Sequence, residues 1–90
     1  MSTEDFRPPS MRLTGWFLKD HPRYRETLGL TPEHYRFDRV VWRSGVAALR
    51  QMLATMAAER GLEVDDRDLD RAVANLVEGI MLEAESWGGP

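Results

Sequence analysis

Two apolar runs with helical spacing dominate the hydrophobic pattern of this chain. The first advances in steps of four and three residues and comprises Trp42, Val46, Leu49, Leu53 and Met56. The second repeats these steps and comprises Leu69, Val73, Leu76 and Ile80. Each run places one apolar stripe on a helix, and the short acidic connection between them makes the helices antiparallel. The pattern predicts an all-α fold built on a helical hairpin of residues 31–60 and 66–87, with Leu49 and Ile80 in its core.

The first long helix has two alternative starts. Thr31 can cap it with Pro32 in the first helical position, and Asp38 can cap it seven residues later. We favour a start at Thr31, with an irregularity near Phe37 and an end just before Gly61, because glycine commonly follows a helix terminus.

The second long helix begins with acidic residues, which the helix dipole favours at an N-terminus. Asp65 or Asp66 caps it, and the segment 88–90, Gly-Gly-Pro, ends it. If the connection centres between residues 63 and 64, the residue numbers of two facing positions on the helices add up to about 127. That register predicts the ion pairs Arg50–Glu78 and Arg43–Glu85.

The N-terminal third has weaker signals. Residues 1–10 are predicted to form a disordered arm, and residues 11–90 a single helical domain. The segment 11–20 is either a short helix or an extended segment packed across the hairpin, and Pro22 ends it near residue 20. Residues 23–28 fit one helical turn that stops at Gly29.

A second apolar stripe runs beside the first on the helix of residues 31–60. Its members are Val41, Gly45, Ala48 and Met52. Gly45 and Ala48 let another backbone approach closely, and a bare two-helix hairpin leaves this face uncovered. Three alternatives could cover this face: the segment 13–28 of the same chain, a second copy of the chain in a homodimer, or a different protein.

Composition narrows the class of protein. The chain has no cysteine and no apolar run near the roughly 20 residues that span a bilayer, so we expect no membrane partner and a cytoplasmic location. The formal net charge of −3 hides an asymmetry. Residues 11–50 hold eight basic against four acidic residues, whereas residues 51–90 hold three against nine. Such a split indicates either a basic binding face or two halves that attract each other.

No motif in the chain carries recognisable catalytic chemistry. His34 and Asp38 are spaced to share a helix face as a base and its orienting carboxylate, but no nucleophile accompanies them, and a solvated histidine is the better interpretation. The acidic run 66–70 resembles the start of a calcium loop, yet Arg71 occupies the position that requires glycine. We therefore expect no enzymatic activity, no cofactor and no metal site.

Aromatic and basic residues interleave between residues 16 and 43, and this segment is the functional candidate. The expected partner-binding residues are Trp16, Lys19, Arg23, Tyr24, Arg25, Tyr35, Arg36 and Arg39. Such residues suit buried anchors in a protein partner, and we expect a protein-interaction module that acts as an adaptor, accessory subunit or inhibitor. The alternative is a DNA- or RNA-binding regulator that uses the basic segment 12–43, although a sequence pI near 5.3 is low for that class.

Overall fold

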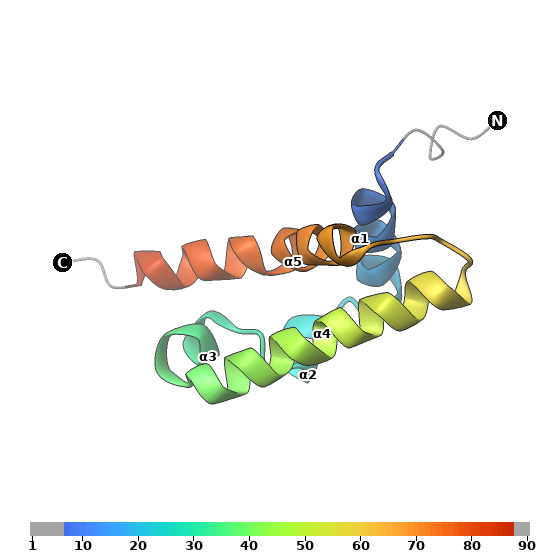
Figure 1. Cartoon of the computed structure of the whole chain (residues 1–90). Coiled ribbons are helices and arrows are strands. Elements are labelled where there is room, and N and C mark those ends of the chain that lie inside the picture. Colours follow the sequence, from blue (N-terminus) through green and yellow to red (C-terminus); the bar gives the residue numbers. More distant parts are fainter. Residues whose placement is uncertain (1–6, 88–90) are drawn as a thin grey trace.

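The computed structural model describes residues 7–87, which form five helices and no strand. The helices are α1 (Pro9–Asp20), α2 (Tyr24–Thr27), α3 (Pro32–Phe37), α4 (Arg39–Glu59) and α5 (Asp66–Ser86). Figure 1 shows the long helices α4 and α5 running in opposite directions, with α1 crossing them near their connection. The predicted all-α class is confirmed.

The predicted first long helix is in fact two helices, and each of its two alternative starts begins one of them. The Thr31 side chain accepts a hydrogen bond from the His34 N–H at 3.2 Å and begins α3. The Asp38 carboxylate accepts one from the Val41 N–H at 3.2 Å and begins α4. Asp38 itself has a non-helical backbone, with φ −140° and ψ 78°. The irregularity expected near Phe37 is therefore a complete break, and the prediction of one continuous helix from Thr31 is wrong.

The connection between α4 and α5 follows the local signals closely. Gly61 has φ +68°, the left-handed conformation that ends a helix at little cost in glycine. Asp65 and Asp68 each accept a hydrogen bond from the other's backbone N–H, which forms a capping box at the start of α5. The expected stop at 88–90 lies outside the described residues.

The N-terminal third is more regular than its sequence suggested. Its first helix begins at Pro9, so the predicted arm is wrong at Pro9 and Ser10, and Ser10 is buried. Residues 1–6 of that arm lie outside the described part. The helix ends at Asp20, as Pro22 predicted, and α2 ends before Gly29, whose φ is +71°.

The core draws on every helix except α3. Leu49 and Ile80, the residues predicted for the centre of the hairpin, are both fully buried. Leu13 and Phe17 from α1 are equally buried, and so is Leu30 from the segment after α2. The N-terminal third therefore supplies part of the same core, which suits a chain too small for two independent cores.

The segment 21–30 covers the second stripe of α4. Gly45 is buried, and a Cβ atom built on it would lie 2.1 Å from the Leu28 carbonyl oxygen and 3.0 Å from a Leu30 methyl carbon. Tyr24, which opens α2, donates a hydrogen bond from its hydroxyl to the Leu76 carbonyl at 2.7 Å and thereby ties this segment to α5. Of the three covers considered for the stripe, the chain's own N-terminal third is the one found over Gly45.

The predicted ion-pair register of the long helices is wrong. Arg50 pairs with Asp70 and with Asp66, the latter at 3.3 Å, rather than with Glu78. Neither Arg43 nor Glu85 takes part in an ion pair within residues 7–87. The reason lies in the connection, which folds back on α4 instead of turning tightly. The Leu62 N–H donates to the Ala57 carbonyl at 2.8 Å, which ends α4, and the chain then runs back along α4 before α5 begins (Figure 1).

Replacing Gly45 with alanine tests the close approach to Leu28. Alanine has the better helix propensity, yet its methyl group would overlap the Leu28 carbonyl, so we expect the free energy of unfolding to fall by about 1–3 kcal/mol. Gly79→Ala is the matched control, because Gly79 is exposed in α5 and a Cβ there meets only an Arg25 nitrogen at 4.0 Å. The control should gain up to about 1 kcal/mol in urea unfolding. Equal responses of the two variants would contradict the contact.

Truncating Leu49 tests the core. Its side chain is fully buried, so Leu49→Ala should reduce the free energy of unfolding by about 2–5 kcal/mol. Chemical denaturation monitored by circular dichroism measures this loss. A loss below about 0.5 kcal/mol, the range of neutral surface changes, would mean that the core is drawn incorrectly.

Candidate functional site

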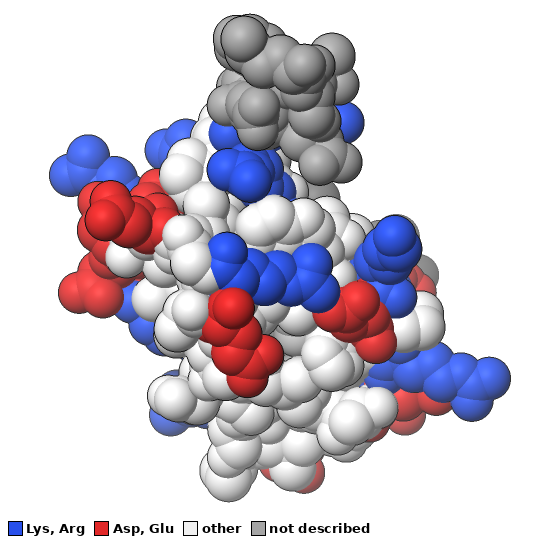
Figure 2. Space-filling view, turned by 90° about the vertical axis from the view of Figure 1, so that its right-hand side faces the viewer, with Lys and Arg blue, Asp and Glu red and all other residues white. Residues whose placement is uncertain are grey.

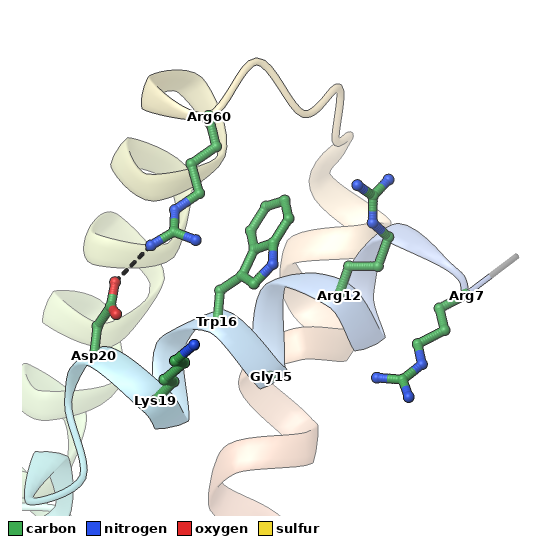
Figure 3. Close-up of a pocket in the computed structure, with 7 residues that line it drawn as sticks. All are labelled: Arg7, Arg12, Gly15, Trp16, Lys19, Asp20 and Arg60. Atoms are coloured by element: carbon green, nitrogen blue, oxygen red, sulfur yellow. Dashed lines mark hydrogen bonds and ion pairs between the residues drawn. The ribbon is translucent and has the colours of Figure 1, made fainter. Parts of the chain in front are cut away.

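A basic pocket of about 410 Å³ lies where α1 meets the C-terminal end of α4 (Figure 3). The residues that line it are Arg7, Arg12, Gly15, Trp16, Lys19, Asp20 and Arg60. Of these lining residues four are cationic and one, Asp20, is a carboxylate, in a chain whose total formal charge is −3. We refer to this cavity as the basic pocket.

The amphipathic pattern of α1 sets one wall of the basic pocket. The buried stripe of this helix consists of Ser10, Leu13 and Phe17, which face the core. Arg12, Trp16 and Lys19 follow at steps of four and three residues, so they share the neighbouring face of the helix. Burial of the first stripe thus fixes the direction of the second. Arg60, which caps the end of α4, completes the opposite wall.

Trp16 stands between two arginines. The guanidinium carbon of Arg12 lies 5.2 Å from the indole centroid, and that of Arg60 lies 4.9 Å from it. Figure 3 shows the indole with one arginine on each side. A cation held over an indole face contributes about 0.5–1 kcal/mol at an exposed site. Both guanidinium groups are consequently held in place before any ligand arrives.

The cations of the pocket differ in how they are paired. Arg60 forms an ion pair with Asp20 at 2.7 Å. Arg7, Arg12 and Lys19 take part in none of the ion pairs within residues 7–87. The Arg12 Nε atom is also buried without a hydrogen-bond partner in that range, and a buried donor left unbonded costs about 1–3 kcal/mol. An oxyanion in the pocket would offset the charges of the three cations.

The predicted partner-binding residues do not form one surface. Trp16 and Lys19 line the basic pocket, and Arg23 is exposed beside a separate small cavity near α2. Tyr35 and Arg39 lie at the start of the hairpin, where the Arg39 guanidinium stacks over the Tyr35 ring at 4.1 Å. The eight residues are thus divided among separate regions of the molecule.

Three of the predicted contact residues, Tyr24, Arg25 and Arg36, make contacts with α5. Tyr24 is only 6% exposed, so its placement on a free surface is wrong. It belongs to the core because α2 lies over α5, where its hydroxyl is hydrogen-bonded and its ring meets Phe17 edge-on at 5.6 Å. Arg36 is exposed, as expected, but it donates to the Ala84 carbonyl near the end of α5 at 3.0 Å. Arg25 forms an exposed ion pair with Glu83 at 3.9 Å.

The stripe predicted for self-association is partly occupied. Gly45 lies beneath Leu28, so it cannot admit a second chain. Val41, Ala48 and Met52 are half-buried, and Met52 lines a cavity of about 220 Å³ together with residues of the segment 21–28. Association through the parts of the stripe that remain accessible stays a prediction.

Sequence reasoning missed three of the four cationic residues that line the basic pocket. Arg7 was assigned to the arm, and Arg12 was counted only as part of the basic segment. The steps from Arg12 to Trp16 and Lys19 are a signal that could have placed these three on one helix face. Arg60 carries no such signal, because only the tertiary structure brings the end of α4 to α1.

The remaining titratable clusters have structural roles. His34 Nδ1 lies 2.9 Å from the Thr31 hydroxyl, and the Asp38 carboxylate caps α4, so these two residues do not form a base and its orienting partner. His21 stacks on Phe17 with ring centroids 4.7 Å apart. Within residues 7–87, no group of three or more histidines or carboxylates is arranged to hold a metal ion.

Comparison with known proteins gives no family for this chain. No protein-family model, curated protein or solved structure matches it significantly. Among the helices of residues 7–87, none combines the length and the apolar character that a bilayer crossing requires.

The Asp20–Arg60 ion pair offers a test of the pocket's electrostatics. Both side chains are about 40% exposed, so Asp20→Asn should change the free energy of unfolding by less than about 1 kcal/mol. The substitution removes the one carboxylate that residues 7–87 contribute to the pocket, and with it the ion pair of Arg60. Titration calorimetry with hexaglutamate should then show an affinity about fivefold higher than that of the wild type, because one unit charge at short range in water is worth about 1 kcal/mol. Unchanged or weaker binding would contradict this description.

Proposed function

We propose that this chain is a non-catalytic protein-interaction module that binds an acidic segment of a partner through the basic pocket. One observation carries the proposal. Three cationic side chains without a carboxylate partner in the described residues line a single cavity, around an indole already held between two arginines. An anionic segment that enters this cavity meets positive charge that is fixed in advance, which lowers the entropic cost of binding.

The basic pocket suits a short acidic segment better than a nucleic acid. Arginines cover both faces of Trp16, so no base can stack on its indole, and stacking supports most sequence-tolerant binding of single strands. Figure 2 shows acidic side chains beside the basic ones on this end of the molecule, without a continuous basic track. Nucleic acid remains the runner-up partner.

A catalytic function lacks comparable support. The two histidines of the chain contact Phe17 and Thr31, and neither lines the basic pocket. The pocket offers cations, one paired carboxylate and an indole, which is a set suited to binding rather than to proton transfer or nucleophilic attack.

Hexaglutamate and oligothymidylate separate the two candidate partners. We expect hexaglutamate to shift the Trp16 indole N–H resonance in ¹H–¹⁵N spectra, and Arg12→Ala or Lys19→Ala to weaken its binding by about threefold to tenfold. Arg43→Ala is the matched control, because Arg43 is an exposed helical arginine outside the pocket and outside every described ion pair. Urea unfolding of each variant verifies that the fold is retained.

Two outcomes would overturn this proposal. If Arg43→Ala weakened hexaglutamate binding as much as Arg12→Ala did, the attraction would be diffuse and not a property of the pocket. If oligothymidylate bound more tightly than hexaglutamate at equal ionic strength, with a slope against salt that fell by about one for each lost arginine, the runner-up function would replace it.

A further inference from the structure

The basic pocket holds more positive charge than one carboxylate can neutralise. Arg7, Arg12 and Lys19 contribute three charges that no carboxylate of residues 7–87 offsets, since Asp20 pairs with Arg60. A glutamate side chain brings a single negative charge. A phosphorylated serine or threonine brings about −1.5 to −2 at pH 7, together with three strong acceptor oxygens. The charge of the pocket therefore matches a phosphoryl group more closely.

The donor set favours the same ligand. Arg12 lines the cavity, and its guanidinium carbon lies 5.2 Å from the centroid of the Trp16 ring. An arginine presents its two terminal nitrogens as a planar pair of donors that fits two oxygens of a phosphoryl group. Arg7 and Lys19 line the same cavity and add two further positive charges and their N–H donors. A carboxylate, with only two oxygens, would leave part of this donor set unused.

The surroundings of Trp16 decide between a peptide and a nucleotide as the carrier of that phosphoryl group. Arg12 and Arg60 occupy the two sides of the indole, so the pocket has no free aromatic face for a base. Among residues 7–87, Trp16 is the one aromatic residue that lines it. A phosphorylated side chain on a flexible peptide needs no such face.

We infer that the basic pocket recognises a phosphoserine or phosphothreonine in the partner's acidic segment. This inference rests on the proposed function and deepens it by naming the group that Arg12 binds. Arg12 supplies a planar pair of guanidinium donors, which we call the arginine fork. Lys19 and Arg7 supply positive charge, and Trp16 packs against the arginine fork.

Three synthetic peptides that differ only at their central residue test the inference. Their sequence is Gly-Glu-X-Glu-Gly, in which X is phosphoserine, glutamate or serine. Titrated into the ¹⁵N-labelled full chain at pH 7.5, the phosphoserine peptide should bind at least about tenfold more tightly than the glutamate peptide, and the serine peptide most weakly. The phosphoserine peptide should also shift the Arg12 Nε–H and Trp16 indole N–H resonances.

The variant Arg12→Lys distinguishes the contribution of the planar donor pair of Arg12 from the contribution of its positive charge. Lysine keeps the positive charge but lacks the planar pair of donors, so the preference for phosphoserine over glutamate should fall below about threefold. Arg43→Lys is the control and should leave the preference intact. A preference unchanged in Arg12→Lys would overturn the role assigned to Arg12.

The pH dependence distinguishes the phosphoryl group from acidity in general. The second ionisation of phosphoserine lies near pH 6, so affinity for its peptide should rise severalfold between pH 5 and pH 7.5, while affinity for the glutamate peptide stays nearly constant. The residues that line the pocket are Arg7, Arg12, Gly15, Trp16, Lys19, Asp20 and Arg60, with no histidine among them. The ligand is therefore the expected source of the change.

The possible failures are distinct. Equal affinity for the glutamate and phosphoserine peptides would refute the phosphoryl inference and leave the proposed function standing. No binding of any of the three peptides or of hexaglutamate would refute both. Saturation of the pocket by inorganic phosphate at the concentration that suffices for the phosphoserine peptide would show a small-anion site and overturn the peptide as the ligand.

Discussion

The close approach of the Leu28 carbonyl to Gly45 is the contact on which the arrangement of this chain depends. Only a residue without a side chain allows it, since a Cβ at position 45 would lie 2.1 Å from that oxygen. The approach lets the segment 21–30 lie on α4 and places Tyr24 where its hydroxyl reaches the Leu76 carbonyl of α5. The segment 21–30 therefore contacts both long helices and holds them together. A chain of 90 residues buries too little surface to dispense with that additional core.

The basic pocket is a consequence of this packing rather than of any one helix. Leu13 and Phe17 hold α1 in the core, and the neighbouring face of α1 then carries Arg12 and Trp16 to the end of α4, where Arg60 stacks on the indole. The same docking leaves cations at this end that form no ion pair with any carboxylate of residues 7–87, although the total formal charge of the chain is −3. In the function that we propose, this concentration of positive charge in an otherwise acidic molecule attracts an anionic ligand to one end of the molecule.

Local signals predicted the elements well and the packing poorly. The heptad-like spacing, the caps at Thr31, Asp38 and Asp65, and the glycines after helix ends all depend on residues close in sequence, so they could be recognised without the fold. The break at Asp38 was not predicted because Thr31 and Asp38 are equally good caps, and the sequence pattern does not show that both are used. Gly45 was correctly interpreted as a point of close approach, but which segment approaches is decided by tertiary packing. Tyr24 was misplaced and Arg60 was missed for the same reason, because the residues near them in sequence do not indicate which distant residues they contact.

Isotope-filtered NMR on a mixture of labelled and unlabelled chains measures the central contact most directly. The account predicts strong nuclear Overhauser effects between the α-protons of Gly45 and a δ-methyl group of Leu30, because that methyl carbon lies 3.0 Å from the position of a Cβ at residue 45. These effects should arise within one chain. Their absence, or their appearance only between labelled and unlabelled chains, would show that the N-terminal third does not cover α4 of its own molecule and would contradict the account.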